Sequence, residues 1–309
     1  MNPLAQLERP EHCERFRCFG SDCGVWVSPA ADGPDGRLAS GLAKLSLLDL
    51  HRRFTRFDPS SELSTLNADP RERIPVSTIM ARFIQAATTA ARMTDGLVDP
   101  TLLDDLRRAG YDRDLERPLA LGSMLELAPE RSPGAPASTR AWEWIRLLDG
   151  AQVLERPVGV KLDSGGIAKG LFADVIAESL KDTSSYGIDC AGDLRIGGSA
   201  GVSRVVDVQS PFDHGVLHSY ELTDGGVATS GIGARSWLDV RGAPAHHLLD
   251  PATRKPAFTG IVQVSALACS ALEAEIRAKA ALLSGPARAT AWLEHGGTIV
   301  YEDGSFDVL

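Results

Sequence analysis

The sequence contains no long hydrophobic run. None of its 309 residues lies in a stretch that approaches the roughly 20 apolar residues a membrane-spanning helix needs, which argues against membrane insertion. The N-terminal segment shows neither a basic region followed by an apolar run nor a lipobox, so no secretory signal is seen. We therefore expect a cytoplasmic protein, unless the chain has been trimmed at its start.

Positive charge is also scarce. The formal net charge is −9 and the sequence pI is about 5.3. Arginines do cluster at Arg52, Arg53 and Arg56, but they sit among carboxylates. Nucleic-acid binding proteins normally present a basic surface, and so we expect no nucleic-acid partner.

Cysteine patterns typical of zinc or disulfide proteins are missing as well. Three of the five cysteines, Cys13, Cys18 and Cys23, lie five residues apart rather than in a CxxC pair. An odd total argues against a complete disulfide framework. Reduced thiols in a cytosolic protein are the expected state.

The composition is otherwise that of a globular protein. Hydrophobic residues make up 43% of the chain, which is long enough to bury a sizeable core. The length allows one large domain or two ordinary ones, and there is no internal repeat. We predict a single domain over residues 1–309, with an irregular connection at about residues 112–140, where Pro, Arg, Glu and Ser are frequent.

Three helices are predicted in the first half of the chain. Apolar residues recur at helical spacing over residues 38–57, and Ser77 is placed to cap a helix that runs to about Thr94. Another helix is expected to start at Asp99-Pro100, because proline suits a first helical turn. The remaining predicted helices span residues 167–180, 271–283 and 286–294.

Strands are predicted to dominate the second half. A strand pair or bent strand is expected over residues 16–27. Short strands are predicted over residues 74–76, 142–148, 152–154, 158–162, 187–189, 204–209, 215–222, 236–240, 261–266 and 298–301. Since strict strand–helix–strand units are few, we predict an α+β fold with mixed or antiparallel sheets flanked by helices.

The segment LDSGGIAKG, residues 162–170, carries the strongest local signal. A predicted strand ends at Asp163, two glycines permit close approach of the backbone to a ligand, and a predicted helix begins with Lys169 in its first turn. The free N–H groups and the positive dipole end of a helix suit a diphosphate. Because the GxGxxG and Walker patterns are absent, an ordinary turn with a solvated Lys169 stays open.

A second group combines VATSG, residues 227–231, with HHLLDP, residues 246–251. The hydroxyl groups and the glycine offer hydrogen bonds at close range. His246 and His247 are adjacent, so on a strand their rings point to opposite faces and at most one faces a site. Zinc is not indicated, because neither a helical histidine pair nor a CxxC partner is present.

A third group, on one predicted helix, consists of Glu273, Glu275 and Lys279. Glu275 and Lys279 are four residues apart. This spacing by itself usually marks an ion pair on the protein surface.

Taken together, these segments resemble the FAD:protein FMN transferases, a family often labelled ApbE-type or thiamine-biosynthesis lipoproteins. Five blocks match the family in order, covering most of the chain. They are FDPSSELSTLN at 57–67, GLVDPT at 96–101, DSGGIAKG at 163–170, VATSG at 227–231 and HLLDP at 247–251. The third block followed by the fifth is a specific combination.

The resemblance implies FAD bound in a cleft between two subdomains. It also implies transfer of FMN from FAD to a Thr or Ser hydroxyl of an acceptor protein, with release of AMP and assistance from Mg²⁺. FAD contacts would fall on Phe19, Leu97, Val98, Asp99, Asp163, Lys169 and Leu249. Catalytic roles would fall on Lys169, which would hold the diphosphate, and on Glu275, which would hold a metal ion.

The resemblance breaks down at the metal site. Gly166 corresponds to the family position whose backbone carbonyl helps to bind Mg²⁺, and Glu275 replaces an Asp ligand. Lys279 stands where the family has Thr or a small residue, and an ammonium offers no acceptor to a metal. Either Mg²⁺ binds through Glu275, or Lys279 places its own charge on the diphosphate.

This departure keeps two other functions open. The protein could be a non-catalytic FAD-binding protein with a degenerate metal site. It could also hydrolyse FAD to FMN and AMP, with water in place of the acceptor hydroxyl. In FMN transfer and in FAD hydrolysis alike, the proton of the attacking hydroxyl or water would pass to a nearby carboxylate or to His247. The sequence does not decide between these two acceptors.

Overall fold

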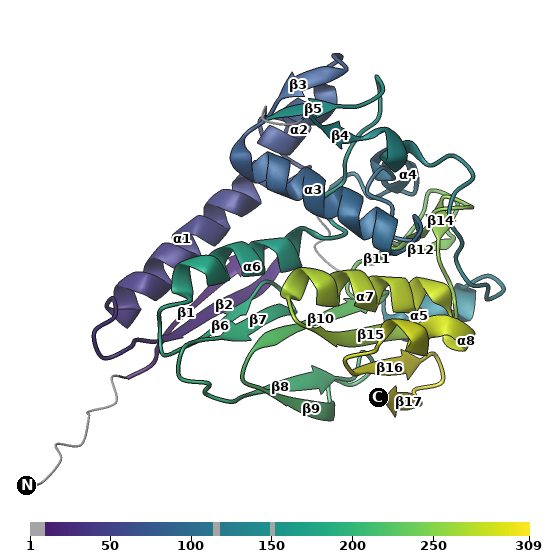
Figure 1. The fold of residues 1–309 in the computed structure, drawn as a ribbon. Helices are drawn as coiled ribbons and strands as arrows, with labels where there is room; N and C mark the ends of the chain where they lie inside the picture. Colours follow the sequence, from purple (N-terminus) through teal and green to yellow (C-terminus); the bar gives the residue numbers. More distant parts are fainter. Residues whose placement is uncertain (1–9, 114–117, 149–151) are drawn as a thin grey trace, which may run out of the picture.

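An eight-stranded antiparallel sheet forms the centre of the protein (Figure 1). The computed structural model describes residues 10–113, 118–148 and 152–309. The sheet consists, in spatial order, of β1 (His12–Cys18), β2 (Ser21–Ser28), β6 (Ser185–Asp189), β7 (Asp193–Gly197), β10 (Gly225–Gly231), β15 (Ile261–Ala268), β16 (Gly297–Tyr301) and β17 (Phe306–Val308). Every neighbouring pair runs antiparallel, and the predicted α+β class is confirmed.

Three helices cover one face of this sheet (Figure 1). They are α1 (Gly36–Phe54), α6 (Ala168–Leu180) and α7 (Ala271–Ser284). Helix α7 packs on β10 and β15, α6 packs on β7, and α1 packs on β1 and β2. Each helix turns apolar side chains toward the sheet, and Leu47, Phe172 and Ile276 are among those that are almost fully buried.

Helices α6 and α7 approach each other unusually closely. A Cβ atom at Gly170 would lie 2.4 Å from the carbonyl oxygen of Ala271, so only glycine fits there without a shift. The contact lies where both helices begin. It sets the distance between the first turn of α6 and the side chains of α7.

Outside this layer the chain forms a smaller group of elements. They are α2 (Glu62–Ala68), α3 (Thr78–Met93), α4 (Leu103–Arg108), α5 (Leu121–Leu127), the 3-10 helix η1 (Ala141–Trp144), and a small sheet in the order β3 (Arg73–Pro75), β5 (Val153–Glu155) and β4 (Arg146–Leu147). Helix α3 contacts α6, as Figure 1 shows. The predicted cap at Ser77 is found, since its side chain accepts a backbone N–H bond at the start of α3, and Ser61 caps α2 in the same way.

The remaining elements are short. They are the hairpin β8 (Arg204–Gln209) and β9 (Val216–Leu222), the pair β11 (Ser236–Leu238) and β12 (Pro244–His246), the pair β13 (Leu249–Asp250) and β14 (Lys255–Pro256), helix α8 (Pro286–Ala289) and the 3-10 helix η2 (Thr290–Trp292). Within the described ranges, no helix combines the length and apolarity that crossing a membrane requires.

The strand predicted over residues 158–162 is wrong. Leu162 makes no ladder, because the side-chain amide of Asn67 donates to its carbonyl and accepts from its N–H, both at 2.8 Å. A buried Asn from α2 thus supplies what a neighbouring strand would have offered. The chain therefore reaches Asp163 held by a side chain and not by a sheet.

The helix predicted from Asp99-Pro100 starts later, at Leu103. The carboxylate of Asp99 accepts bonds from the backbone N–H and the hydroxyl of Thr101, at 2.8 and 2.6 Å. This local turn competes with the helix and delays its start.

Other boundaries also differ from prediction. Helix α5 lies inside the connection predicted as irregular, residues 112–140, of which 114–117 fall outside the described residues. The 3-10 helix η1 replaces the first half of the strand predicted over 142–148, and η2 replaces part of the helix predicted over 286–294. The strand predicted over 298–301 is not the last, because β17 follows it.

Candidate functional site

One pocket collects residues that are far apart in the sequence. Nine of the predicted site residues line it, namely Phe19, Leu97, Val98, Asp99, Asp163, Gly166, Lys169, Leu249 and Lys279. The tenth, Glu275, lies behind the lining. The predicted segments 96–101, 163–170 and 247–251 therefore meet in space.

The turn at residues 163–166 is held in place by fixed partners. The N–H of Asp163 donates to the carbonyl of Pro100 at 2.8 Å, and its carboxylate accepts from the N–H of Gly165 at 3.0 Å. The guanidinium of Arg56 lies 3.3 Å from the same carboxylate, and both side chains are largely buried. Asp163 thus organises the glycine turn and positions a cation beside it.

Lys169 is paired with a carboxylate that the sequence analysis missed. Its Nζ lies 2.6 Å from Oδ2 of Asp193 and 3.3 Å from the carbonyl oxygen of Ala191. Burial raises the pKa of Asp193 to about 6, against the opposing effect of Lys169. Burial would lower the pKa of Lys169, but the carboxylates of Asp193 and Glu275 outweigh it and raise that pKa. Lys169 is therefore held as a cation.

Glu275 and Lys279 form a buried pair and not the surface pair that their spacing suggested. Their side chains are 3% and 9% exposed, and Nζ of Lys279 lies 3.5 Å from Oε1 of Glu275. The ammonium donates to the carbonyl of Gly166 at 2.5 Å, and the other Glu275 oxygen accepts from the N–H of Gly170 at 2.9 Å. Burial lowers the pKa of Lys279, against the effects of Glu275 and Asp193.

Two aromatic groups add apolar surface to the pocket. In the first, Tyr111 stacks on Trp237 with 5.1 Å between ring centroids, and the Arg56 guanidinium lies 4.1 Å from the Tyr111 ring centroid. In the second, Phe19 contacts His51 and Phe172. Flat ring systems are the ligands that such surfaces favour.

Phe19 has a backbone conformation that is rare outside glycine. Its φ is +53°, at the tip of the β1–β2 hairpin, and Arg235 donates to its carbonyl at 3.1 Å. A two-residue hairpin of this kind needs positive φ at both loop positions, and Gly20 with φ of +72° occupies the other, so the turn itself accounts for the conformation that holds Phe19 at the pocket wall.

The two adjacent histidines separate as expected. His246 is fully buried against Phe258, and its Nδ1 accepts from the N–H of Leu248 at 3.2 Å. His247 lines the pocket, and its buried Nδ1 has no hydrogen-bond partner within the described part of the chain. Burial, followed by the charge of Arg235, lowers the pKa of His247 well below its usual value.

The segment VATSG, residues 227–231, does not line the pocket. It belongs to β10 in the middle of the sheet, where the hydroxyl of Thr229 lies 2.7 Å from that of Ser265. The strand packs closely on α7, since Ala228 clusters with Ala274, and a Cβ at the preceding Gly226 would lie 2.4 Å from the N of Ala271. The role of this segment is therefore to support α7.

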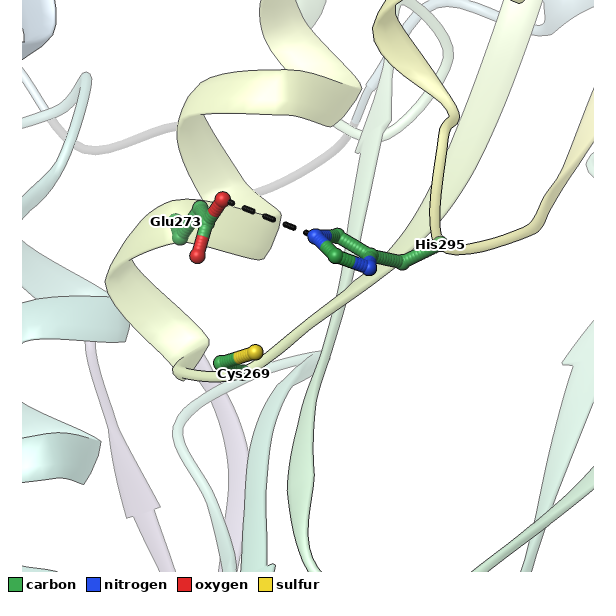
Figure 2. A group of neighbouring side chains, drawn as sticks. All are labelled: Cys269, Glu273 and His295. Atoms are coloured by element: carbon green, nitrogen blue, oxygen red, sulfur yellow. Dashed lines mark ion pairs between the residues drawn. The ribbon is translucent and has the colours of Figure 1, made fainter.

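A separate group of potential metal ligands consists of Cys269, Glu273 and His295 (Figure 2). Their ligand atoms lie within 4.8 Å of one another, but none of the three lines the pocket. Glu273 already accepts a bond of 2.8 Å from Arg277, and it lies in the first turn of α7, where the helix dipole is positive. The Arg277 guanidinium and the positive end of the α7 dipole both repel a divalent cation there.

Comparison with known proteins identifies a family. The model of the ApbE family matches residues 21–301. An FAD:protein FMN transferase of Rhodobacter capsulatus is 26% identical over 287 residues, which are 89% of this chain and 52% of the relative. One of Salmonella typhimurium is 27% identical over 210 residues, or 65% of this chain and 58% of the relative. The chain thus spans little more than half the length of these relatives.

Solved structures show the same fold. The ApbE protein of Thermotoga maritima has a TM-score of 0.78 and 24% identity, with 97% of each chain covered. The flavinyl transferase ApbE of Pseudomonas stutzeri has a TM-score of 0.76 and 21% identity, with 100% of this chain and 96% of the other covered. At these identities the likeness establishes the fold.

Proposed function

The chain belongs to the ApbE family, and from this premise we propose that it transfers FMN from FAD to a Thr or Ser hydroxyl of an acceptor protein, releasing AMP. The observation that carries the proposal is the pocket itself. It combines a cationic wall built on the turn at residues 163–166 with two aromatic surfaces. FAD has a diphosphate and two ring systems, and so presents the matching groups.

The charge of the pocket supports a diphosphate ligand. The charged side chains among the described lining residues are Arg56, Lys169, Arg235 and Lys279, and the acidic Asp99 and Asp163. The pocket surface thus presents more cationic than acidic side chains, while the carboxylates of Asp193 and Glu275, which pair with Lys169 and Lys279, lie outside the lining. A local cationic site in an acidic protein attracts and orients an anion of opposite charge.

The proposed step is an in-line displacement. The acceptor hydroxyl oxygen attacks the phosphorus on the FMN side of the diphosphate, and the bond from that phosphorus to the bridging oxygen breaks. The bridging oxygen leaves with AMP. We assign to Lys169, which is held charged by Asp193, the stabilisation of the negative charge on the phosphate oxygens.

We assign the hydroxyl proton to His247. His247 lines the pocket, and its ring is neutral because burial and Arg235 lower its pKa, which also makes it a weak base. Both carboxylates of the lining already have partners: Asp163 binds Arg56 and the N–H of Gly165, and Asp99 accepts from the N–H and the hydroxyl of Thr101.

Mg²⁺ does not fit the place that the family resemblance gives it. Magnesium needs oxygen ligands at about 2.0–2.1 Å in near-octahedral geometry. The Gly166 carbonyl accepts a bond from the Lys279 ammonium instead, and Glu275 is shared between Lys279 and the N–H of Gly170. The proposed step therefore uses no metal ion.

One experiment tests the function. The purified protein is incubated with FAD and bacterial protein extract, AMP is measured by chromatography, and flavin fixed to protein is detected by fluorescence in a denaturing gel. Transfer predicts AMP and a fluorescent band together. AMP with free FMN and no band would indicate a hydrolase, and FAD binding without AMP would indicate a carrier.

A further inference from the structure

We propose that the Lys279 ammonium takes the place of a divalent metal ion, so that this protein binds and positions FAD without Mg²⁺. The inference rests on the proposed function for its ligand, but it concerns how the diphosphate is neutralised and not what happens to FMN afterwards. It follows from a disagreement between the donor set of this chain and a metal site.

The ammonium lies at the centre of the oxygen atoms that would otherwise face a metal. Nζ of Lys279 is 2.5 Å from the carbonyl oxygen of Gly166, 3.4 Å from that of Gly165 and 3.5 Å from Oε1 of Glu275. The three contacts come from two elements, the glycine turn and α7. The two carbonyl contacts are hydrogen bonds and the Glu275 contact is an ion pair, so one of the three N–H donors of the ammonium is left for a ligand.

Lys279 has no easy route away from this position. The residue is 7% exposed, and it sits on a helix whose start is pressed against α6 at Gly170. Moving the ammonium out would leave Glu275, which is 2% exposed, without its cation. An unpaired buried carboxylate is costly, so the pair is expected to persist when a ligand binds.

The same position is suitable for a diphosphate. Lys279 lines the pocket beside Lys169 and Gly166, so its charge faces the space where the proposed ligand lies. A metal ion within a few ångströms would be repelled by this fixed charge. When protonated, the ammonium supplies one positive charge, and Glu275, which accepts from the N–H of Gly170, lies beside it.

The test measures FAD binding by calorimetry in EDTA and in Mg²⁺ with the wild-type protein and three variants. Lys279→Met removes the charge with little change of volume, and Lys279→Thr removes it but offers an oxygen. Lys181→Met is the matched control, since Lys181 is an exposed lysine that does not line the pocket. Thermal unfolding of each variant confirms that it folds.

The wild-type protein and Lys181→Met should bind FAD equally well in EDTA and in Mg²⁺. Lys279→Met should bind FAD about tenfold or more weakly in both, as expected for loss of a charge-assisted bond. Lys279→Thr should bind FAD as weakly as Lys279→Met in EDTA, but should regain affinity in Mg²⁺. Adding Glu275→Gln to Lys279→Thr should cancel that regained affinity.

Wild-type FAD binding that collapses in EDTA would overturn the proposal, and this measurement depends on no variant. Unchanged affinity in Lys279→Met would overturn it too. A different result would reject the proposed transfer: FAD would bind without Mg²⁺, but neither AMP nor a labelled acceptor protein would form. The two ideas can therefore be rejected separately.

Discussion

The Nζ atom of Lys169 lies 2.6 Å from Oδ2 of Asp193, and the Asp193 side chain is 1% exposed. Lys169 comes from the first turn of α6, whereas Asp193 begins β7 in the sheet beneath it. The pair fixes the lysine at the pocket wall and keeps it charged. It also means that removing the lysine strands a buried carboxylate, which any mutational test has to take into account.

Lys169→Met should weaken the binding of FAD more than the binding of riboflavin, because riboflavin lacks the diphosphate. A charge-assisted hydrogen bond is worth about 1.5–3 kcal/mol, or roughly tenfold to hundredfold in Kd. Calorimetry with both ligands checks this. The double variant Lys169→Met/Asp193→Asn is the control, since it also removes the stranded carboxylate. Equal losses for both ligands would show that Lys169 does not recognise the diphosphate.

His247→Asn should abolish most transfer while leaving FAD affinity nearly unchanged, if the ring accepts the acceptor's proton. Loss of general base catalysis costs about 10²–10⁴-fold in rate. Release of AMP gives the rate and calorimetry gives the affinity. A parallel fall of both would instead indicate that His247 binds FAD.

How far the sequence predicts this site depends on where each residue comes from. Asp163, Gly166 and Lys169 share one short segment, so local pattern was enough to group them. Arg56 and Arg235 entered the pocket through packing between distant segments, which no local spacing reveals. Asp193 gave no signal, because a single carboxylate at the start of a strand is ordinary until a lysine is brought next to it.

The wrong predictions of local structure also arise from contacts between distant segments. Residues 158–162 have the apolar composition of a strand, but the side chain of Asn67 takes the backbone bonds that a ladder would make. The pair of Glu275 and Lys279 has the spacing of a surface ion pair, but α7 packs both on the sheet and against α6, and this packing buries the pair. In both cases tertiary contacts override a correct local preference.

His246 should make the protein acid-sensitive. Burial lowers its pKa to about 3, below the unfolded value of about 6.5, so the folded state favours the neutral ring. The stability that it contributes is fully present above about pH 6.5 and is lost as pH falls toward about 3, at up to roughly 1.4 kcal/mol per pH unit.

Urea unfolding of the wild type and of His246→Asn between these pH values measures this contribution. Asn can still accept from the N–H of Leu248, as Nδ1 does now, but does not titrate. The difference in unfolding free energy between the two proteins should shrink as the pH falls. A difference independent of pH would show that His246 is not the titrating group.

Gly170→Ala should both destabilise the fold and weaken the binding of FAD. The added Cβ would lie 2.4 Å from the carbonyl oxygen of Ala271 and 2.8 Å from the N of Leu272, both backbone atoms, so one helix has to move. Overpacking of this kind costs about 1–3 kcal/mol. The N–H of Gly170 also holds Glu275, and so a shift of α6 disturbs the support of Lys279.

Gly41→Ala is the matched control, because Gly41 is inside α1 and an added Cβ there meets nothing within 4 Å. It should stabilise the protein by about 0.5–1 kcal/mol, the ordinary gain from replacing glycine inside a helix. Urea titrations give both free energies, and calorimetry gives the FAD affinities. If Gly170→Ala also stabilised the protein, α6 and α7 would not be in contact at Gly170. If it destabilised the protein but left FAD affinity intact, the bond from Gly170 to Glu275 would have no part in positioning Lys279.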